Sequence, residues 1–332
     1  MSCPFFKGVN WGFRLTSVNG YFSSEAAREE ARKIAGLGIQ WVCRNCIVMQ
    51  DTFASVRQYR DFSRTPGDDE LCDIIGYLHQ LGIQVMLRPM IECHDGMQRV
   101  HINLPECSIY PNTVDYRKLW FESYAELTRH YCRIATRCGC EAYGMDSELN
   151  QLVPYTEYWM PVIETARKHF SGHLTSSFVG CHQYAGLVAA EPNHWFYALD
   201  SVGSSMYSPP HGRTRDAREM AKMLSYAVEE NRAFANAYKG GNYYFGECGC
   251  CSVKDGAQLP WSPKGKTIYD GEEQANYMSA VIQAFSAEPW WHGMFWWDWD
   301  EGVSDSKLHF SIDGKPAAQI MKTWCAGNGE GN

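Results

Sequence analysis

Short apolar runs alternate with longer amphipathic stretches along the whole chain. Most of the apolar runs lack a strict alternation of polar and apolar residues, which is typical of parallel strands covered on both faces. We therefore predict strands at residues 6–13, 39–48, 85–91, 142–148, 174–179, 201–207, 243–247 and 293–297.

The stretches between these runs have the spacing of amphipathic helices. They cover residues 24–35, 69–81, 115–137, 156–170, 214–238, 272–287 and 316–324, and the weakest helical pattern is at 185–198. Twice a helix ends at a glycine and a strand follows, at Gly38-Ile39 and at Gly82-Ile83. The offset of 44 residues between these two places is about one strand–helix unit.

Strands that alternate with helices predict a parallel sheet. A doubly wound open sheet would carry a glycine-rich phosphate turn after its first strand, and none follows Phe13. Eight units predict an α/β fold, a single (β/α)8 TIM barrel, with residues 1–332 as one catalytic domain.

Composition narrows the possible partners. The chain has 332 residues and a formal charge of −8, from 30 basic and 38 acidic residues, so we expect neither a nucleic acid nor an anionic membrane as partner. No apolar run is long enough to span a membrane.

The N-terminus lacks the basic-then-apolar order of a signal peptide, and we expect a cytoplasmic location.

The cysteines lie mostly inside predicted strands and helices, so we interpret the 14 of them as reduced thiols in the core. Examples are Cys43, Cys72, Cys132 and Cys181. Cys43 and Cys46 have the spacing of one zinc knuckle, and Cys248-Gly249-Cys250-Cys251 is a second thiol group. A strand would turn Cys43 and Cys46 to opposite faces, so we expect no metal site, and no cofactor is implied.

In such barrels the active site lies at the carboxyl ends of the strands. Glu148 ends the fourth predicted strand and Glu247 the seventh, and a pair of carboxylates is the minimal machinery of glycoside hydrolysis. A single glutamate there would equally fit a solvated loop or a helix N-terminus. Tryptophans around the eighth strand offer flat apolar faces, which suit a sugar ring. Other polar or aromatic candidates at strand ends and in the following loops are Asn10, Trp11, Arg44, Arg88, His94, Asp95, Asn150 and Asp298. Arg44 and Arg88 also fit the role of buried ion-pair partners.

Several stretches together resemble a known family. They are Gly38-Ile39-Gln40-Trp41-Val42, Leu81 to Pro89, Gly144 to Leu149, Phe245 to Gly249 and Trp291 to Trp297. Their order and spacing look like those of clan A glycoside hydrolases and, more narrowly, of glycoside hydrolase family 113, whose described members are β-1,4-mannanases and related mannoside hydrolases.

The resemblance implies a retaining mechanism with Glu148 as acid/base and Glu247 as nucleophile. It also implies that Tyr207 donates a hydrogen bond to Glu247 and that Trp297 forms the floor of the −1 subsite. Many clan A enzymes have Asn directly before the acid/base, where this chain has Ser147. Asn150 is then a candidate for holding the sugar 2-hydroxyl.

The resemblance implies a mannoside substrate, and we expect an oligosaccharide rather than a polymer because a cytoplasmic enzyme meets imported oligosaccharides. We expect an exo-type enzyme, with the loops at 91–115 and 251–271 and the acidic residues Asp298, Asp300 and Glu301 closing one end of the cleft. The alternatives are an endo-β-1,4-mannanase, another clan A β-glycosidase specific for gluco- or galacto-sugars, and a non-catalytic carbohydrate-binding barrel.

Overall fold

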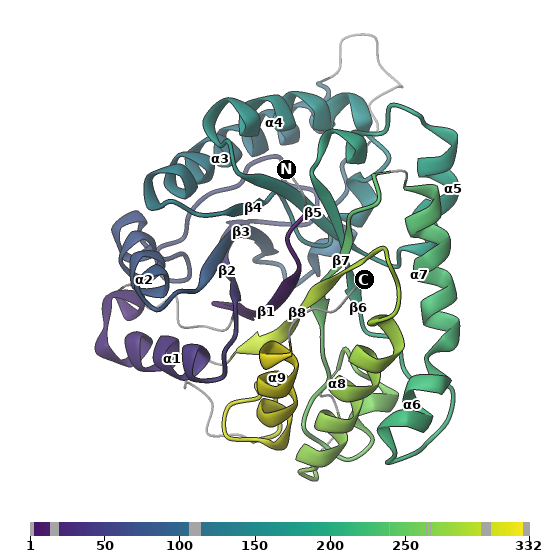
Figure 1. Ribbon diagram of the computed structural model, residues 1–332. Coiled ribbons are helices and arrows are strands. Elements are labelled where there is room, and N and C mark those ends of the chain that lie inside the picture. The colour runs from purple at the N-terminus through teal and green to yellow at the C-terminus, as the bar shows by residue number, and fades with distance from the viewer. Residues whose placement is uncertain are drawn as a thin grey trace.

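Eight parallel strands close into a barrel in the order β1 to β8, with β1 paired to β8 (Figure 1). The structure is a computed structural model that describes residues 3–13, 20–105, 114–238, 240–262, 265, 267–299 and 307–327. The strands are β1 Phe6–Trp11, β2 Trp41–Gln50, β3 Gln84–Cys93, β4 Ala142–Gly144, β5 His173–Val179, β6 Ser201–Met206, β7 Tyr243–Cys248 and β8 Trp291–Trp299. The predicted α/β barrel is confirmed.

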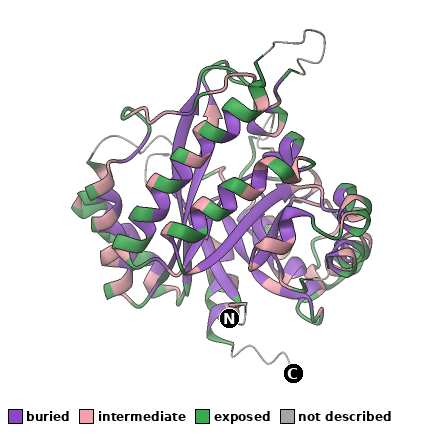
Figure 2. Cartoon of the chain, turned by 90° about the horizontal axis from the view of Figure 1, so that it is seen from above, coloured by how far each residue is buried: buried purple, intermediate pink, exposed green. Residues whose placement is uncertain are grey.

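Helices surround the barrel and turn their exposed faces outward, while the strands are buried (Figure 2). They are α1 Glu25–Gly36, α2 Asp68–Gln80, α3 Tyr116–Cys138, α4 Thr156–His169, α5 His182–Ala190, α6 Ala217–Met223, α7 Ser225–Ala237, α8 Gly271–Phe285 and α9 Pro316–Ala326. The stretch predicted as one helix at 214–238 is divided at Leu224 into α6 and α7. The weak pattern at 185–198 corresponds to α5 and a separate 3-10 turn, Trp195–Ala198.

The fourth strand is much shorter than predicted. β4 ends at Gly144, although the strand was predicted to continue to Glu148. The amides of Met145 and Glu148 still donate to β5, to the carbonyls of Thr175 at 2.7 Å and Ser177 at 2.9 Å. The segment after β4 therefore stays beside β5 without regular strand geometry.

Apolar cores lie on both sides of the strands. The interior contains Phe6, Trp41, Cys43, Met86, Ala142, Tyr244 and Phe295. A larger core, which includes Cys46, fills the space between strands and helices. The Cys46 thiol lies 3.2 Å from the Tyr131 hydroxyl of α3, so Cys43 and Cys46 face opposite sides of β2, as the strand period requires.

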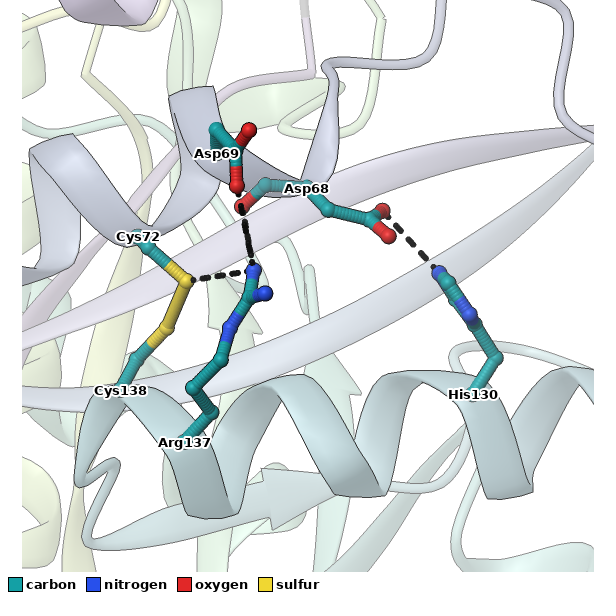
Figure 3. The surroundings of a disulfide bond; sticks show 6 residues. All are labelled: Asp68, Asp69, Cys72, His130, Arg137 and Cys138. Carbon is teal, nitrogen blue, oxygen red and sulfur yellow. Dashed lines mark hydrogen bonds and ion pairs between the residues drawn. A yellow bond between two sulfur atoms is a disulfide. The ribbon is translucent and has the colours of Figure 1, made fainter.

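The expectation that all thiols would be reduced is wrong for one pair. Cys72 of α2 and Cys138 of α3 form a disulfide (Figure 3). Their Cα atoms are 5.5 Å apart, within the range that a disulfide can span, because these two helices pack side by side. Arg137 donates to Cys72 Sγ at 3.1 Å and lies 3.6 Å from the Asp69 carboxylate. The other cysteines in the described part of the chain form no disulfide.

Among the described residues, no helix combines the length and the apolar composition needed to cross a membrane.

Candidate active site

A cleft of about 990 Å³ lies over the carboxyl ends of the strands. Both predicted catalytic residues, Glu148 and Glu247, contribute to its lining. The other lining residues come from the ends of β3, β5, β6 and β8, from the loops that follow the strands, and from α5 and α7. They include Phe13, Glu92, Gln98, Arg99, Val179, Cys181, His182, Met206, Tyr207, Trp261, Trp297 and Phe310.

A bulge in β7 aims Glu247 into the cleft. Tyr244 belongs to the barrel interior and Phe245 to the outer core, so strict alternation would turn Glu247 outward. The pairing between β6 and β7 shifts register at Gly246, since Ser204 is opposite Phe245 and Ser205 is opposite Glu247. One extra residue in a strand redirects the side chains beyond it, and such bulges are common beside active sites.

The Glu247 carboxylate accepts hydrogen bonds from three side chains. Ser147 donates to Oε1 at 2.8 Å, and Tyr207 donates to Oε2 at 3.1 Å. The Arg88 guanidinium lies 3.3 Å from Oε1. Donors that converge on a carboxylate favour its ionised form, which is the form that a nucleophile requires.

Arg88 reaches Glu247 from inside the barrel. Its guanidinium donates to Asn10 Oδ1 at 2.7 Å and to Asn45 Oδ1 at 3.0 Å, while Asn10 Nδ2 donates to the Gly246 carbonyl at 3.1 Å. A Cβ at Gly144 would lie 2.8 Å from Arg88 Cγ, so the missing side chain at Gly144 makes room for the arginine. Arg88 and Asn10 thus position the Glu247 carboxylate from below.

Glu148 follows β4 in a left-handed backbone conformation, with φ of 62°. This conformation is uncommon for a residue with a side chain and is found most often at functional sites. Its carboxylate pairs with Arg99 at 3.2 Å. Arg99 also pairs with Glu92 at 2.7 Å, so one guanidinium joins two cleft carboxylates.

The pKa of Glu247 is raised to about 7, mainly by burial and next by the neighbouring Glu148 charge. Arg88, Arg99 and the Ser147 hydroxyl act in the opposite direction. Two carboxyls that lie close together do not easily ionise at the same time, so the pair holds one proton below this pH.

Asp146 supports the segment that carries both Ser147 and Glu148. Its buried carboxylate accepts hydrogen bonds from the Ser176 hydroxyl and from the Ser177 amide of β5. Burial raises the pKa of Asp146 to about 7. The carboxylate ties the irregular segment after β4 to its neighbouring strand.

Aromatic side chains form the apolar walls of the cleft. Trp297 of β8 packs against Phe13, with ring centroids 4.8 Å apart. Tyr207 packs edge-on against Phe310. Trp261, in the loop after β7, is 55% exposed although it lines the same cleft. This mixture of flat apolar faces and carboxylates is suited to sugar rings and their hydroxyls.

Two predicted substrate-binding residues lie away from the cleft. Trp11 is fully buried and packs against Phe22. Arg44 is also fully buried, with its guanidinium 3.5 Å from the centre of the Phe22 ring and donating to the Trp11 carbonyl at 3.1 Å. The prediction that they touch substrate is wrong, because both side chains point into the core outside the barrel.

Arg88 and Asn10 were also predicted to bind substrate, and the structure places them one layer below the cleft. Both are buried beneath Glu247 and do not line the cleft: Arg88 contacts Glu247, and Asn10 contacts Arg88.

His94, Asp95, Asn150 and Asp298 do not line the cleft either. His94 faces Asp61, with 3.7 Å between the two side chains. Asp95 accepts from the amides of Phe53 and Met97 and shapes its own loop. Asn150 bonds both backbone groups of Val179, at 2.7 and 3.1 Å, so its amide is not available to a sugar 2-hydroxyl. Asp298 is buried, and Asp300 and Glu301 lie outside the described residues.

Of the predicted set, Glu148, Glu247, Tyr207 and Trp297 share the cleft. Sequence reasoning missed Arg99, Phe13, Trp261 and Phe310, which lie on loops without a recognisable motif. It also did not predict the hydrogen bond from Ser147 to Glu247. Arg99 lies in a long loop, and the sequence does not indicate with which carboxylates such an arginine pairs.

Within the described ranges, no three His, Cys, Asp or Glu side chains are grouped closely enough to hold a metal ion.

Known proteins with the same architecture include several glycosidases. A structure described as a GH113 β-1,4-mannanase is 27% identical, has a TM-score of 0.84, and is matched over 98% of this chain and 100% of its own. A GH113 β-mannanase from Alicyclobacillus acidocaldarius, in complex with ManMIm, is 24% identical over 97% of both chains, with a TM-score of 0.83. A structure of fungal β-1,4-galactanases, 12% identical with a TM-score of 0.60 over 96% of this chain and 99% of its own, shares the fold alone.

A search of curated protein sequences found no match. The model of Glycoside Hydrolase Family 113 matches residues 9–313, which is nearly the whole chain. This match agrees with the two glutamates at one cleft, and the chain belongs to glycoside hydrolase family 113.

Proposed function

We propose that this protein hydrolyses β-1,4-mannosidic bonds in mannan-derived oligosaccharides with retention of configuration, Glu247 acting as nucleophile and Glu148 as acid/base. The observation that carries the proposal is the pairing of these two carboxyls at one aromatic-walled cleft, with Glu247 held by three donors.

In the first step the ionised Glu247 carboxylate attacks the anomeric carbon. The bond from this carbon to the leaving oxygen breaks, and the proton carried by Glu148 passes to that oxygen. Arg88, Ser147 and Tyr207 hold the attacking carboxylate in place, which reduces the motion needed to reach the transition state.

In the second step Glu148 acts as a base. It takes a proton from water, the water oxygen attacks the anomeric carbon, and the bond to Glu247 breaks. Two inversions at one carbon give net retention. Glu148 ends the cycle protonated and Glu247 ends it ionised.

The mannoside specificity rests on the family and on the β-1,4-mannanases of the same fold, of which one is matched over its whole length. The cleft volume is near the upper end of the range for small-ligand pockets, which favours an oligosaccharide over a single sugar. Asp298 does not line the cleft and gives no support to an end-trimming action. The support comes from the loops after β3 and β7, which contribute Gln98, Arg99 and Trp261 to the lining of the cleft.

A cytoplasmic location is the second part of this proposal. Ten of the eleven free cysteines among the described residues are buried and could persist as thiols in a reducing compartment. The Cys72–Cys138 disulfide argues in the other direction.

The test is a time course of cleavage of reducing-end-labelled β-1,4-mannotetraose, with the wild type, Glu247→Ala and the surface variant Glu122→Ala. Glu122 is exposed on α3, so its loss should leave turnover unchanged. Turnover should be lost in Glu247→Ala only. The first labelled fragment separates end-trimming from internal cutting, and NMR of the fresh product reads the anomeric configuration.

Failure of the wild type to cleave mannotetraose, together with cleavage of gluco- or galacto-configured oligosaccharides that depends on Glu247, would refute mannoside specificity. Release of the inverted anomer would refute the assignment of Glu247 as nucleophile. Binding of oligosaccharide without any cleavage would instead indicate a carbohydrate-binding barrel.

A further inference from the structure

Arg99 lies between two carboxylates at the wall of the cleft. Its guanidinium is 2.7 Å from Glu92 Oε1 and 3.2 Å from Glu148 Oε2. Only 8% of the residue is exposed, and the guanidinium also lies 5.4 Å from the centre of the Phe13 ring. The arginine is therefore held on three sides, in contact with one catalytic carboxyl.

The three charged residues come from separate pieces of chain. Glu92 is near the end of β3, Arg99 begins the 3-10 turn Arg99–His101 in the next loop, and Glu148 follows β4. Glu148 has a left-handed backbone conformation, and among the described residues its carboxylate accepts a side-chain hydrogen bond from Arg99 alone. Arg99 is thus the contact that orients its carboxyl.

The positive charge of Arg99 beside Glu148 works against the proposed role of Glu148 as a proton donor. An opposite charge at this distance stabilises the ionised carboxylate, whereas a general acid must keep its proton until the leaving oxygen takes it. Glu92 is the closer partner of Arg99, and its negative charge offsets the positive one as seen from Glu148. Burial raises the pKa of Glu92 and Arg99 lowers it, so the Glu92 charge depends on the same guanidinium.

We propose that Arg99 and Glu92 are positioning residues that act through Glu148: Arg99 orients its carboxyl, and Glu92 offsets the arginine charge so that Glu148 keeps its proton until the glycosidic bond breaks. The inference rests on the proposed role of Glu148 as acid/base. After the first step Glu148 is a carboxylate, and the same guanidinium stabilises it until water is deprotonated.

Other ionisable groups also act on this carboxyl pair. Glu247 on β7, Tyr207 after β6 and Asp146 after β4 interact electrostatically with Glu148, and Arg88 on β3 acts on Glu247. These groups stay unchanged in the Arg99 and Glu92 variants below. A difference between variants therefore reports on Arg99 and Glu92.

The experiment measures the pH at which the carboxyl pair loses its last proton in the wild type, Arg99→Met, Arg99→Lys and Glu92→Gln. The readout is the ¹³C signal of labelled glutamate carboxyls, with the two catalytic signals assigned by their loss in Glu148→Gln and Glu247→Gln. The pH dependence of kcat/KM on mannotetraose gives a second reading. Arg32→Met, at an exposed ion pair of α1, is the matched control, and a thermal melt checks the folding of each variant.

Arg99→Met should raise this pH by about one unit and Glu92→Gln should lower it by about one unit, because each removes a charge of opposite sign beside Glu148. Arg99→Lys keeps the charge and should stay near the wild type, with kcat reduced because a single ammonium orients the carboxyl less well. Arg32→Met should not shift the profile.

Shifts in the same direction for Arg99→Met and Glu92→Gln, a shift in one of them alone, or no shift in either would overturn the inference. A purely structural role would lower the melting temperature without these opposite shifts. The NMR reading needs no substrate, so it decides the inference even if mannotetraose is not cleaved. A failure to cleave mannotetraose would count against the proposed function only.

Discussion

The Ser147 hydroxyl donates a hydrogen bond of 2.8 Å to Oε1 of Glu247, which lies 100 positions further along the chain. The next residue after Ser147 is Glu148, the proposed acid/base. A segment of two residues after β4 therefore supplies one catalytic carboxyl and supports the other, so its position relative to β7 determines both halves of the mechanism.

Ser147→Ala should lower kcat/KM about tenfold or more, since a hydrogen bond to a charged group contributes about 1.5–3 kcal/mol. Steady-state kinetics on mannotetraose would measure the change. Ser23→Ala is the control, because the Ser23 hydroxyl bonds an exposed aspartate on the surface. Unchanged kinetics in Ser147→Ala would show that this bond does not support the nucleophile.

The value of kcat/KM should begin to fall with rising pH near pH 7. The charge of Glu148 is one of the causes that raise the pKa of Glu247 to about 7, so this value describes the loss of the last proton of the pair. The active form carries one proton, and kcat/KM should fall about tenfold per pH unit above this point. A profile of kcat/KM against pH would show it. A flat profile through pH 7 and beyond would contradict the assignment.

Gly144→Ala should damage the site through Arg88. The new Cβ would lie 2.8 Å from Arg88 Cγ and 3.0 Å from Cδ, so the arginine must move away from Glu247 and Asn10. We expect a loss of about 1–3 kcal/mol in unfolding free energy and a clear drop in kcat. Gly186→Ala on α5 has open space around the added methyl and should be neutral or slightly stabilising. Equal effects of the two substitutions in denaturant melts and kinetics would refute this explanation.

Trp261→Ala should weaken binding of long substrates more than short ones. The exposed indole lines the cleft and offers a flat face to a sugar ring. Since burial of an aromatic face contributes about 1–2 kcal/mol in such contacts, we expect KM for mannotetraose to rise about tenfold at nearly constant kcat. Trp261→Phe should retain part of the affinity. A fall in kcat with KM unchanged would place the indole in the chemical step instead.

The Cys72–Cys138 disulfide should contribute to stability and not to catalysis. It closes a loop of 66 residues between two surface helices, and the chain-entropy model gives about 4 kcal/mol for a loop of this length. Dithiothreitol should lower the melting temperature of the wild type by roughly 5 °C. The double variant Cys72→Ala/Cys138→Ala should melt at this lower temperature and not respond to the reductant. A further response in the double variant would mean that other cysteines are bonded.

The sequence by itself was enough to predict the barrel and the pair of glutamates. Apolar periodicity is a local property, and eight strands alternating with helices leave few topologies. Parallel strands place their carboxyl ends on one rim, so Glu148 and Glu247 could be assigned to it from order alone. The same local pattern misplaced the end of β4, because the sequence does not show where regular hydrogen bonding to the neighbouring strands stops.

Only the tertiary structure decided which rim residues face the cleft. Strict alternation would turn Glu247 outward, and a bulge at Gly246 redirects it. Trp11 is the last residue of strand β1 and Arg44 lies in strand β2, but their side chains enter the outer core. The Arg99 contact with Glu148 and the Cys72–Cys138 bond join segments that are 49 and 66 residues apart. Such pairings depend on loop paths and helix packing, which are set by the whole fold and not by any local pattern.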